Sequence, residues 1–282
     1  MKVRQSTLGD ADTCLRRMQY SIEGNVYHGG AARAVGTAYH YGLEWAYNRE
    51  IENGVWPDVR MAIVEAQECF VRTENLDPSH ESELSKQRGQ FTWTKQIPDR
   101  ETAFQLIDTM LRSYWATEGA HWEPPWQVLG TEVGFSLPLW GGDKHTRNGS
   151  IDLVGVDPDG YVFGDDHKTA GRAWPYNKHH ARKQNQAPWY LEALRELYPD
   201  AFGYRFFFSI MTYKGDFERR EVVVTDEHIR AVEEKALQVV TLYDGMRGAG
   251  LDLPANPGSN LCSPLYCDHW DVCPYGAALD NQ

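Results

Sequence analysis

The sequence lacks any run of about 18 consecutive apolar residues, the length that a helix needs to cross a lipid bilayer. Its N-terminal stretch, MKVRQSTLGDADTCLRRMQ, also lacks the apolar core of a secretory signal. We therefore expect a protein that does not contact a membrane and that works in a reducing, cytoplasmic environment.

Basic residues are scarce, since 28 Lys and Arg stand against 40 Asp and Glu and the formal net charge is -12. This balance excludes a protein that coats nucleic acid by bulk electrostatic attraction. It does not exclude an enzyme that acts on DNA, because acidic residues that hold divalent metal add negative charge, and a local basic groove can still hold phosphates.

Internal repeats and low-complexity linkers are absent, so a single domain over residues 1–282 is the simplest organisation. We expect mainly helices in residues 1–125, strands in residues 126–225, and a last helix with an irregular Cys-rich tail in residues 226–282. This order predicts an α/β domain with a helical N-terminal layer. The expected helices are Ser6–Tyr20, Ala32–Glu52, Val59–Thr73, Asp99–Thr117, Lys178–Leu197 and Thr225–Met246, and the expected strands are Val128–Leu139, Gly149–Val156, Tyr161–Lys168, Tyr204–Thr212 and Phe217–Val224.

One predicted hairpin, Gly149–Lys168, carries the main functional signal. Its loop, Pro158-Asp159-Gly160, is typical of a three-residue turn with Gly at the left-handed position. That register places Asp152 opposite Asp166. Lys168 lies two residues beyond Asp166, so strand alternation puts it on the same face.

Two neighbouring carboxylates repel each other unless a cation lies between them. Oxygen ligands of this kind suit Mg²⁺ or Mn²⁺, and a nearby lysine can orient or help deprotonate a water, or neutralise a phosphate. Together these groups form the minimal apparatus for metal-assisted hydrolysis of a phosphodiester bond. The alternative is a solvated strand end on which Asp165, Asp166 and Lys168 form a surface ion pair.

Four short motifs follow one another along the chain: Gly36-Thr37-Ala38-Tyr39-His40-Tyr41-Gly42-Leu43-Glu44 (G-T-x-x-H-x-x-L-E), Gly149-Ser150-Ile151-Asp152 (G-x-x-D), Asp166-His167-Lys168 ((D/E)-x-K) and Gln186-Ala187-Pro188-Trp189-Tyr190 (Q-x-x-x-Y). In this order they resemble the motifs of the RecB-like nucleases of the PD-(D/E)XK superfamily. Their order and spacing agree over roughly residues 6 to 275. The resemblance implies a restriction-endonuclease-like core, with a mixed central sheet flanked by helices.

The resemblance also implies roles for the matched residues. His40, Asp152 and Asp166 would be metal ligands, the main-chain carbonyl of His167 would be a further candidate ligand, and Lys168 would be catalytic. The alternative for His40 alone is an ordinary satisfied or solvated histidine on a helix.

Gln186 and Tyr190 lie four residues apart, so on a helix they point the same way. The resemblance implies that they line the active site or contact DNA, whereas the alternative is ordinary packing. The chain departs from the family pattern in having Asp166 where many members have Glu. Asp165 would be a rival ligand if the register of the turn differed.

The chain has five cysteines, an odd number, and no export signal, so we do not expect disulfides. Cys262, Cys267 and Cys273 crowd into the tail with the spacing C-x4-C-x5-C, and Cys14 lies near the N-terminus. Four thiolates suit a [4Fe–4S] cluster or a structural Zn²⁺, and the alternative is a set of free thiols in a loose tail. Cys69 is expected to pack alone in a helix.

This pattern of one early cysteine and a late trio, with Pro274 after Cys273, resembles the iron–sulfur arrangement of AddB nuclease domains and of CRISPR-associated RecB-like nucleases. The C-x5-C-P part matches well, and the first gap is longer than in many members. The resemblance implies a structural [4Fe–4S] cluster bound by all four cysteines. Because Cys14 and Cys262 are 248 positions apart, such a cluster would close a very long loop and contribute to the free energy of folding.

Basic and aromatic side chains cluster after the catalytic lysine and near the other motifs. They could hold phosphates and stack on bases, or they could form a solvated helix face. No zinc-finger or helix-turn-helix signature is present, so we do not expect sequence-specific reading. The set comprises Arg172, Lys178, His179, His180, Arg182, Lys183, Arg16, Arg17 and Arg33, with Trp174, Tyr176 and Trp189.

The leading hypothesis is a metal-dependent DNA exonuclease of a bacterial or phage-infected cell, acting on DNA ends in recombination, end processing or CRISPR adaptation. A recombination or CRISPR partner protein and a homo-oligomer are both compatible with the resemblance. Three other interpretations stay open: a structure-selective or single-strand DNA endonuclease, a non-enzymatic DNA-binding scaffold stapled by metal, and an electron-transfer protein. The presence of Asp152, Asp166 and Lys168 together argues against the scaffold.

Overall fold

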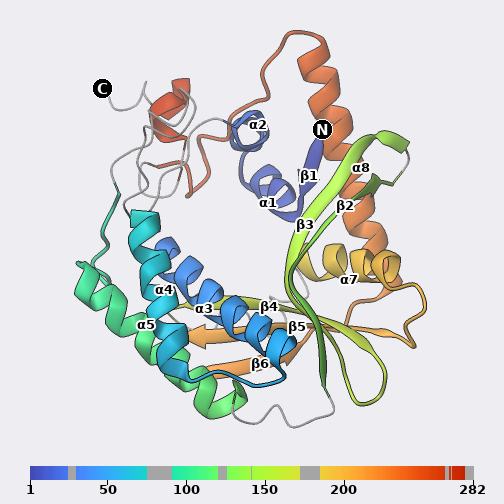
Figure 1. The fold of residues 1–282 in the computed structure, drawn as a ribbon. Helices are drawn as coiled ribbons and strands as arrows, with labels where there is room; N and C mark the ends of the chain where they lie inside the picture. The colour runs from blue at the N-terminus through green and yellow to red at the C-terminus, as the bar shows by residue number, and fades with distance from the viewer. Residues whose placement is uncertain are drawn as a thin grey trace.

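The protein is built around one mixed β-sheet with helices on both sides (Figure 1). The computed structural model describes residues 1–24, 30–74, 91–119, 126–140, 142–171, 185–263, 267 and 269–276. The sheet order is β1-β3-β4-β5-β6, and β2 pairs with β3. The strands are β1 (Lys2–Arg4), β2 (Gln127–Leu139), β3 (Gly142–Val156), β4 (Val162–Ala170), β5 (Tyr204–Thr212) and β6 (Phe217–Glu221). The predicted α/β fold with a mixed central sheet is confirmed.

Two buried clusters hold the helices against the sheet. One cluster joins α3 (Ala31–Asn53), α4 (Val59–Glu74) and α5 (Arg100–Tyr114) to one side of the sheet. The other joins the sheet to a second set of helices, which are α1 (Gln5–Thr13), α2 (Leu15–Glu23), α7 (Gln186–Leu197) and α8 (Asp226–Gly248). The helical N-terminal layer therefore divides, with α3 to α5 on one side of the sheet and α1 and α2 on the other.

The hairpin between β3 and β4 forms in the predicted register. Gly160 has a φ of 83°, and its amide donates to the carbonyl oxygen of Asp157 at 3.0 Å. The ladder then runs outward to the pair Leu153–Asp165 and ends there. Asp152 and Asp166 would form the next pair, so they lie at the point where the two strands separate.

The other end of β3 has a different neighbour. Its residues Thr146–Asn148 pair in parallel with β1, whereas residues 153–156 pair with β4. Neither strand pairs with residues 149–152, although β2 pairs with β3 on the opposite edge along nearly its whole length. The sheet therefore has a notch on one edge of β3, next to the end of the β3–β4 ladder.

Several elements differ from the sequence-based expectations. The single helix expected over Ser6–Tyr20 is wrong: Cys14 adopts extended backbone angles (φ −164°, ψ 118°) and separates α1 from α2. Strand β1 was not expected, because three residues carry no usable periodicity and their conformation depends on pairing with β3. The first part of the expected helix Lys178–Leu197 lies outside the described residues, and α7 begins at Gln186.

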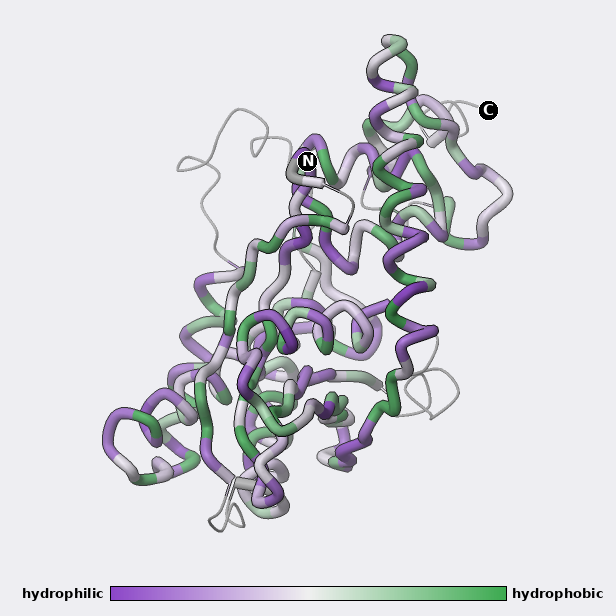
Figure 2. The backbone as a smooth tube through the Cα atoms, turned by 90° about the vertical axis from the view of Figure 1, so that its right-hand side faces the viewer, coloured by the Kyte–Doolittle hydropathy of each residue, from purple (hydrophilic) through white to green (hydrophobic). Residues whose placement is uncertain are grey.

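Other expected elements match closely. The strand Tyr204–Thr212 has the predicted bounds, and α3 and α4 begin or end within a residue of theirs. Helix α5 ends at Tyr114 and continues as a π-helical turn, Trp115–Gly119, and a short 3-10 helix, Trp270–Val272, lies in the tail. Hydrophobic and hydrophilic residues are interspersed along the chain in Figure 2. Within the described part, no helix has both the length and the apolar character needed to span a membrane.

Candidate active site

Asp152 lies where β3 and β4 separate, and its carboxylate takes the place of the missing ladder. The backbone amide of His167 on β4 donates to Asp152 Oδ2 at 2.8 Å. On the other side, Nδ1 of His40 lies 3.3 Å from the same oxygen. The side chain of Asp152 thus connects the sheet to helix α3.

Asp166, on β4, is buried and both of its oxygens have partners from neighbouring side chains. Lys168 Nζ forms an ion pair with Oδ2, and Gln186 Nε2 donates to Oδ1. Gln186 is the first residue of α7, and Tyr190 follows one turn later on the same face of that helix. The structure therefore brings together the residues of the predicted (D/E)-x-K and Q-x-x-x-Y motifs.

Helix α3 delivers His40 because it packs closely on β4. A Cβ atom at Gly36 would lie 2.9 Å from the side-chain Oγ1 of Thr169, so glycine permits this approach without a shift of that side chain. His40 lies one turn further along the same face. Burial lowers the pKa of His40, with Asp166 opposing that effect, so the imidazole is held in the neutral form that binds metal.

Burial raises the pKa of Asp152 to about 7, and Lys168 only partly opposes this shift. Burial also raises the pKa of Asp166 to about 7, with the charge of Asp152 adding to the effect. Two buried carboxyl groups beside a neutral imidazole offer oxygen and nitrogen ligands, and a divalent cation would favour the ionised form of both carboxyl groups. The residues present therefore fit a divalent metal ion.

Glu132, on β2, belongs to the same centre and was not predicted from the sequence. Ligand atoms of His40, Glu132 and Asp152 all lie within 4.8 Å of one another. Glu132 lies across from Asp152 in the β2–β3 ladder, has a φ of 44°, and accepts a 2.7 Å hydrogen bond from Ser150 Oγ. The only available signal was an acidic residue within a predicted strand, which became meaningful once the pairing of that strand was known.

Of the two residues that flank Asp166, Asp165 points away from this centre, whereas Nδ1 of His167 lies 3.9 Å from Asp152 Oδ2. Asp165 is fully buried and accepts from Ser209 Oγ at 2.6 Å and from Arg219 Nε at 3.0 Å. The alternative in which Asp165 replaces Asp166 as a ligand is therefore not supported by the register. The imidazole of His167 packs against Tyr47 and Tyr114, with ring centroids 6.4 and 6.1 Å away, and burial lowers its pKa to about 3.

Asp166 is not part of the group within 4.8 Å, which contains His40, Glu132 and Asp152. Its two oxygens contact Lys168 and Gln186. Lys168 is thus the counter-ion of Asp166.

The four cysteines that are expected to bind a cluster line one small cavity at the C-terminal end of α1. Cys14 lines it from the break between α1 and α2, and the C-terminal segment contributes Cys262, Cys267 and Cys273. The backbone amide of Asn256 donates to Cys14 Sγ at 3.3 Å. All four thiols are free, and Cys69 packs separately in α4, as expected.

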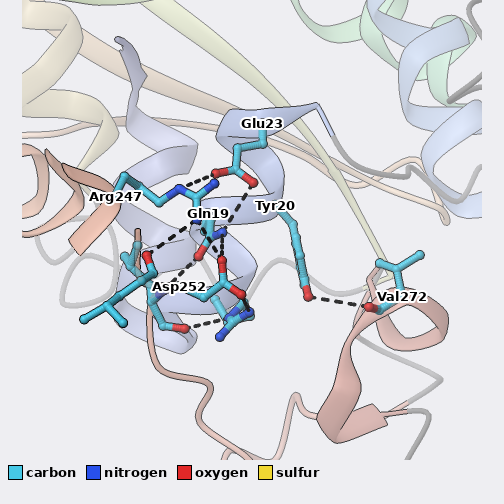
Figure 3. A network of polar contacts seen from close by, with 9 residues as sticks. Gln19, Tyr20, Glu23, Arg247, Asp252 and Val272 are labelled. Atoms are coloured by element: carbon cyan, nitrogen blue, oxygen red, sulfur yellow. Dashed lines mark hydrogen bonds and ion pairs between the residues drawn. The ribbon is translucent and has the colours of Figure 1, made fainter. Parts of the chain in front are cut away.

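A polar network joins α2 to the segment that precedes the cysteines (Figure 3). The amide group of buried Gln19 donates to Asp252 at 2.9 Å and accepts from the backbone of Leu253 at 2.8 Å. Arg247 bridges Asp252 and Glu23, at 2.8 and 3.0 Å. These contacts connect helix α2, which follows Cys14, to the segment that precedes Cys262.

The predicted DNA-contacting residues have varied positions. Arg16 and Arg17 form ion pairs with Asp252 and Asp10 beside the cysteines. The proposal that Trp189 stacks on bases is wrong, because its side chain is fully buried and its indole N–H donates to the carbonyl of Asn148. The remaining members of the basic and aromatic cluster after Lys168 lie outside the described residues. These are Arg172, Trp174, Tyr176, Lys178, His179, His180, Arg182 and Lys183.

Comparison with family models gives a match over nearly the whole chain. A family model described as the PD-(D/E)XK nuclease superfamily matches residues 5–274. Among solved structures, the chain is similar to SSO0001, at 13% identity over 92% of this chain and 94% of that chain, with a TM-score of 0.37. It is also similar to a protein from Eubacterium rectale provisionally named an exonuclease, at 14% identity over 92% and 90% of the two chains, with a TM-score of 0.39. No curated protein sequence matches the chain significantly.

Proposed function

This chain belongs to the PD-(D/E)XK nuclease superfamily, and we propose that it is a DNA exonuclease organised as a single domain over residues 1–282. Its substrate would be single-stranded or duplex DNA ends. The resemblance of its motifs to RecB-like nucleases supports a role in recombination, end processing or CRISPR adaptation. The observation that carries the proposal is the convergence of Asp152, Asp166, Lys168 and His40 where β3 and β4 separate.

We assign the metal ligands from this geometry. His40, Asp152 and Glu132 would hold Mg²⁺ or Mn²⁺, because their ligand atoms already lie within 4.8 Å of one another. Asp166 and the main-chain carbonyl of His167 would complete the ligand set. A bound divalent ion supplies positive charge to the phosphate and lowers the pKa of a water molecule.

Three side chains would have further roles in the reaction. Lys168, already paired with Asp166, would orient the attacking water and balance negative charge on the phosphate. Gln186 holds Asp166 by a hydrogen bond, so it would position that carboxylate. Tyr190, from the same helix, would line the site beside the scissile bond.

Digestion of end-labelled single-stranded and duplex DNA tests this function. We expect cleavage with Mg²⁺ or Mn²⁺, none with EDTA, and a loss of at least about 100-fold in Lys168→Ala, since general acid–base and charge-balancing groups typically contribute on that scale. Arg60→Ala, on the exposed surface of α4, is the matched control and should cleave normally. Full activity of Lys168→Ala would contradict the proposed centre.

Closed circular DNA distinguishes the exonuclease from an endonuclease with the same chemistry. An enzyme that requires ends leaves closed circles intact and shortens linear DNA from its termini. Cutting of circles would favour the structure-selective or single-strand endonuclease over the exonuclease. It would leave the metal centre and the superfamily assignment unchanged.

The cysteine site is proposed to hold a structural [4Fe–4S] cluster. The convergence of Cys14, Cys262, Cys267 and Cys273 on one cavity supports a metal site with four thiolate ligands, and the resemblance of their spacing to that of iron–sulfur nucleases favours the cluster. The amide of Asn256 that donates to Cys14 Sγ is the kind of hydrogen bond that stabilises a cluster sulfur.

Anaerobic purification tests the metal at this site. We expect a brown protein that absorbs at about 400 nm and contains iron and sulfide in equal amounts. Colourless protein that contains one zinc ion per chain would replace the cluster with a structural zinc site. A Cys69→Ser variant is the control, because Cys69 lies in α4 outside the cavity and should not change metal content.

A further inference from the structure

A groove lies beside residues 148–150 of β3, where the notch begins at the end of β1. Its cavity has a volume of about 610 Å³, within the range of sites that hold small ligands. The pairing of β3 with β1 ends at Asn148 and its pairing with β4 begins at Leu153. Main-chain N–H and C=O groups of residues 149–152 that point away from β2 therefore face this notch instead of another strand. Such groups need hydrogen-bond partners from water or from a ligand.

We call this feature the edge groove and define it by Arg4, Ser6, Gly134, Asn148, Ser150 and Tyr190, which line it. Arg4 and Ser6 lie at the junction of β1 and α1. Gly134, Asn148 and Ser150 come from the β2–β3 hairpin, and Tyr190 comes from α7. Three separate parts of the chain thus build one groove, whose walls are fixed by the sheet and by two helices.

The charge of the edge groove is opposite to that of the molecule. The chain has a net charge of -12, yet no described residue that lines the groove is acidic and one, Arg4, is basic. Arg4 is exposed and forms no ion pair with any residue that the structure describes. An anionic ligand would meet a cation there, with no carboxylate among the described lining residues to repel it.

The groove adjoins the candidate metal centre. Ser150 donates a hydrogen bond to Glu132, which belongs to that centre. Ser150 also lies two residues before Asp152, or roughly 7 Å along a strand. On the other side, Tyr190 lies one turn after Gln186, whose side chain bonds Asp166.

We propose that the edge groove holds the sugar–phosphate backbone of the DNA strand next to the scissile bond. This inference rests on the proposed nuclease function. It adds the path that the DNA strand takes across the protein surface. The strand would run from the metal centre past Ser150 and Tyr190 to Arg4, which would bind a phosphate. Contacts to phosphate and main chain would carry no sequence information, in agreement with the absence of a sequence-reading motif.

Gly134 gives a direct test, because a Cβ atom there would meet no heavy atom within 4 Å. Gly134→Asp and Gly134→Lys should therefore fold equally well and place opposite charges in the groove. We expect Asp to weaken and Lys to tighten the binding of fluorescein-labelled single-stranded DNA, each by roughly three- to tenfold. Binding is measured by fluorescence anisotropy with Mg²⁺ in a Lys168→Ala background, so that DNA stays intact.

Gly248, at the C-terminal end of α8, is the matched control, since a Cβ atom there also meets nothing within 4 Å. Gly248→Asp and Gly248→Lys make the same changes in net charge away from the groove and should differ by less than about twofold. In addition, Arg4→Gln should reduce the slope of log Kd against log salt concentration by about 0.7, the value for one phosphate of a single strand.

The outcomes separate this inference from the proposed function. Equal binding by the two Gly134 variants, or an equal effect at Gly248, overturns the edge groove even if the wild type cleaves DNA. Conversely, a wild type that cleaves no DNA with either metal overturns the nuclease function, whatever the Gly134 variants do. An opposite-signed effect at Gly134, with an active wild type, supports both.

Discussion

Burial sets the protonation of two carboxyl groups at the candidate metal centre and thereby links metal binding to stability. The raised pKa values of Asp152 and Asp166 mean that their charged forms are penalised in the folded protein. A neutral amide of the same shape avoids that penalty. The amide oxygen that Asp152→Asn introduces could still accept the hydrogen bond from the backbone N–H of His167.

We therefore predict that Asp152→Asn raises the Tm of metal-free protein at pH 8 by about 2–5 °C while abolishing both cleavage and stabilisation by Mg²⁺. Thermal unfolding with and without about 10 mM Mg²⁺ measures both effects. Asp159→Asn, an exposed residue of the β3–β4 turn, is the control. A lower Tm for metal-free Asp152→Asn would show that the carboxylate stabilises the fold by itself.

The same shifts predict a pH dependence. Between the ordinary pKa of 3.8 and the folded value of about 7, the folded protein binds more protons than the unfolded chain at Asp152 and Asp166. The stability contributed by these groups therefore falls as pH rises through this window. We expect Mg²⁺ to raise the Tm more at pH 8 than at pH 5.5, because at the lower pH the metal must displace protons.

Comparison with the Asp152→Asn/Asp166→Asn double variant isolates the two groups from the other titrating residues. In that variant the Mg²⁺-induced shift should be absent at both pH values. An equal Mg²⁺ shift at pH 5.5 and pH 8 in the wild type would mean that the carboxylates are already ionised before the metal binds.

At the residue scale, the sequence predicted the members of the site that lie in short motifs. His40, Asp152, Asp166, Lys168 and Gln186 come together in the structure, although their chemical roles stay predictions. Glu132 was missed because its position depends on the pairing of β2 with β3, which no local pattern encodes. A lone acidic residue on a strand gives no signal until the partner strand is known.

At the scale of elements, a buried ion pair joins the three strands β4, β5 and β6. Asp165 is fully buried, and it bonds Ser209 on β5 and Arg219 on β6. Removing one partner of a buried pair leaves an uncompensated charge, which typically costs roughly 3–5 kcal/mol. We predict this loss in the free energy of unfolding for Arg219→Met.

Urea denaturation measures the effect, with Arg230→Met on the exposed face of α8 as the control. The double variant Asp165→Asn/Arg219→Met should recover part of the loss, since the buried charge is then absent. A loss below about 1 kcal/mol in Arg219→Met, the scale of an exposed ion pair, would contradict the buried-pair account.

The polar network at α2 predicts a second effect on an element. Gln19→Leu removes the acceptor for the backbone N–H of Leu253, and an unsatisfied buried donor costs about 1–3 kcal/mol. Because this contact holds the segment that precedes the cysteines, we expect the variant to lose its bound metal to EDTA several times faster than the wild type. Gln105→Leu, on exposed α5, should lose metal at the wild-type rate.

The elements that were predicted correctly are those whose signals are local. The turn Pro158-Asp159-Gly160 fixed the register of the β3–β4 hairpin, and Thr225 and Asp99 cap α8 and α5. The failures depend on tertiary contacts. Strand β1 exists because β3 pairs with it, and the break at Cys14 lies within a stretch that otherwise favours helix.

At the scale of the whole molecule, the cysteine site connects the two ends of the chain without taking part in the sheet. Cys14 meets residues that are about 250 positions later, whereas strands β2 to β6 of the sheet come from residues between them. We predict that Cys14→Ser lowers the Tm of metal-loaded protein and makes the tail after Leu253 accessible to limited proteolysis. The fragment that remains should keep residues 1–253 intact.

Mass spectrometry of the proteolytic fragments identifies the site of cutting. Cys69→Ser, a buried position outside the cysteine cavity, is the control for thiol loss. Cutting that begins within the sheet, at β3 or β4, would mean that the cysteine site supports the core directly.

Helix α1 gives the two proposed sites a shared support. It begins next to Arg4, at one end of the edge groove, and it ends at Cys14, in the wall of the cysteine cavity. Nine helical residues span only about 13 Å and bend little. Loss of the metal or oxidation of Cys14 would tilt this helix and therefore displace the guanidinium of Arg4 at its other end. The oxidation state of the cysteine site would then change how the edge groove binds DNA.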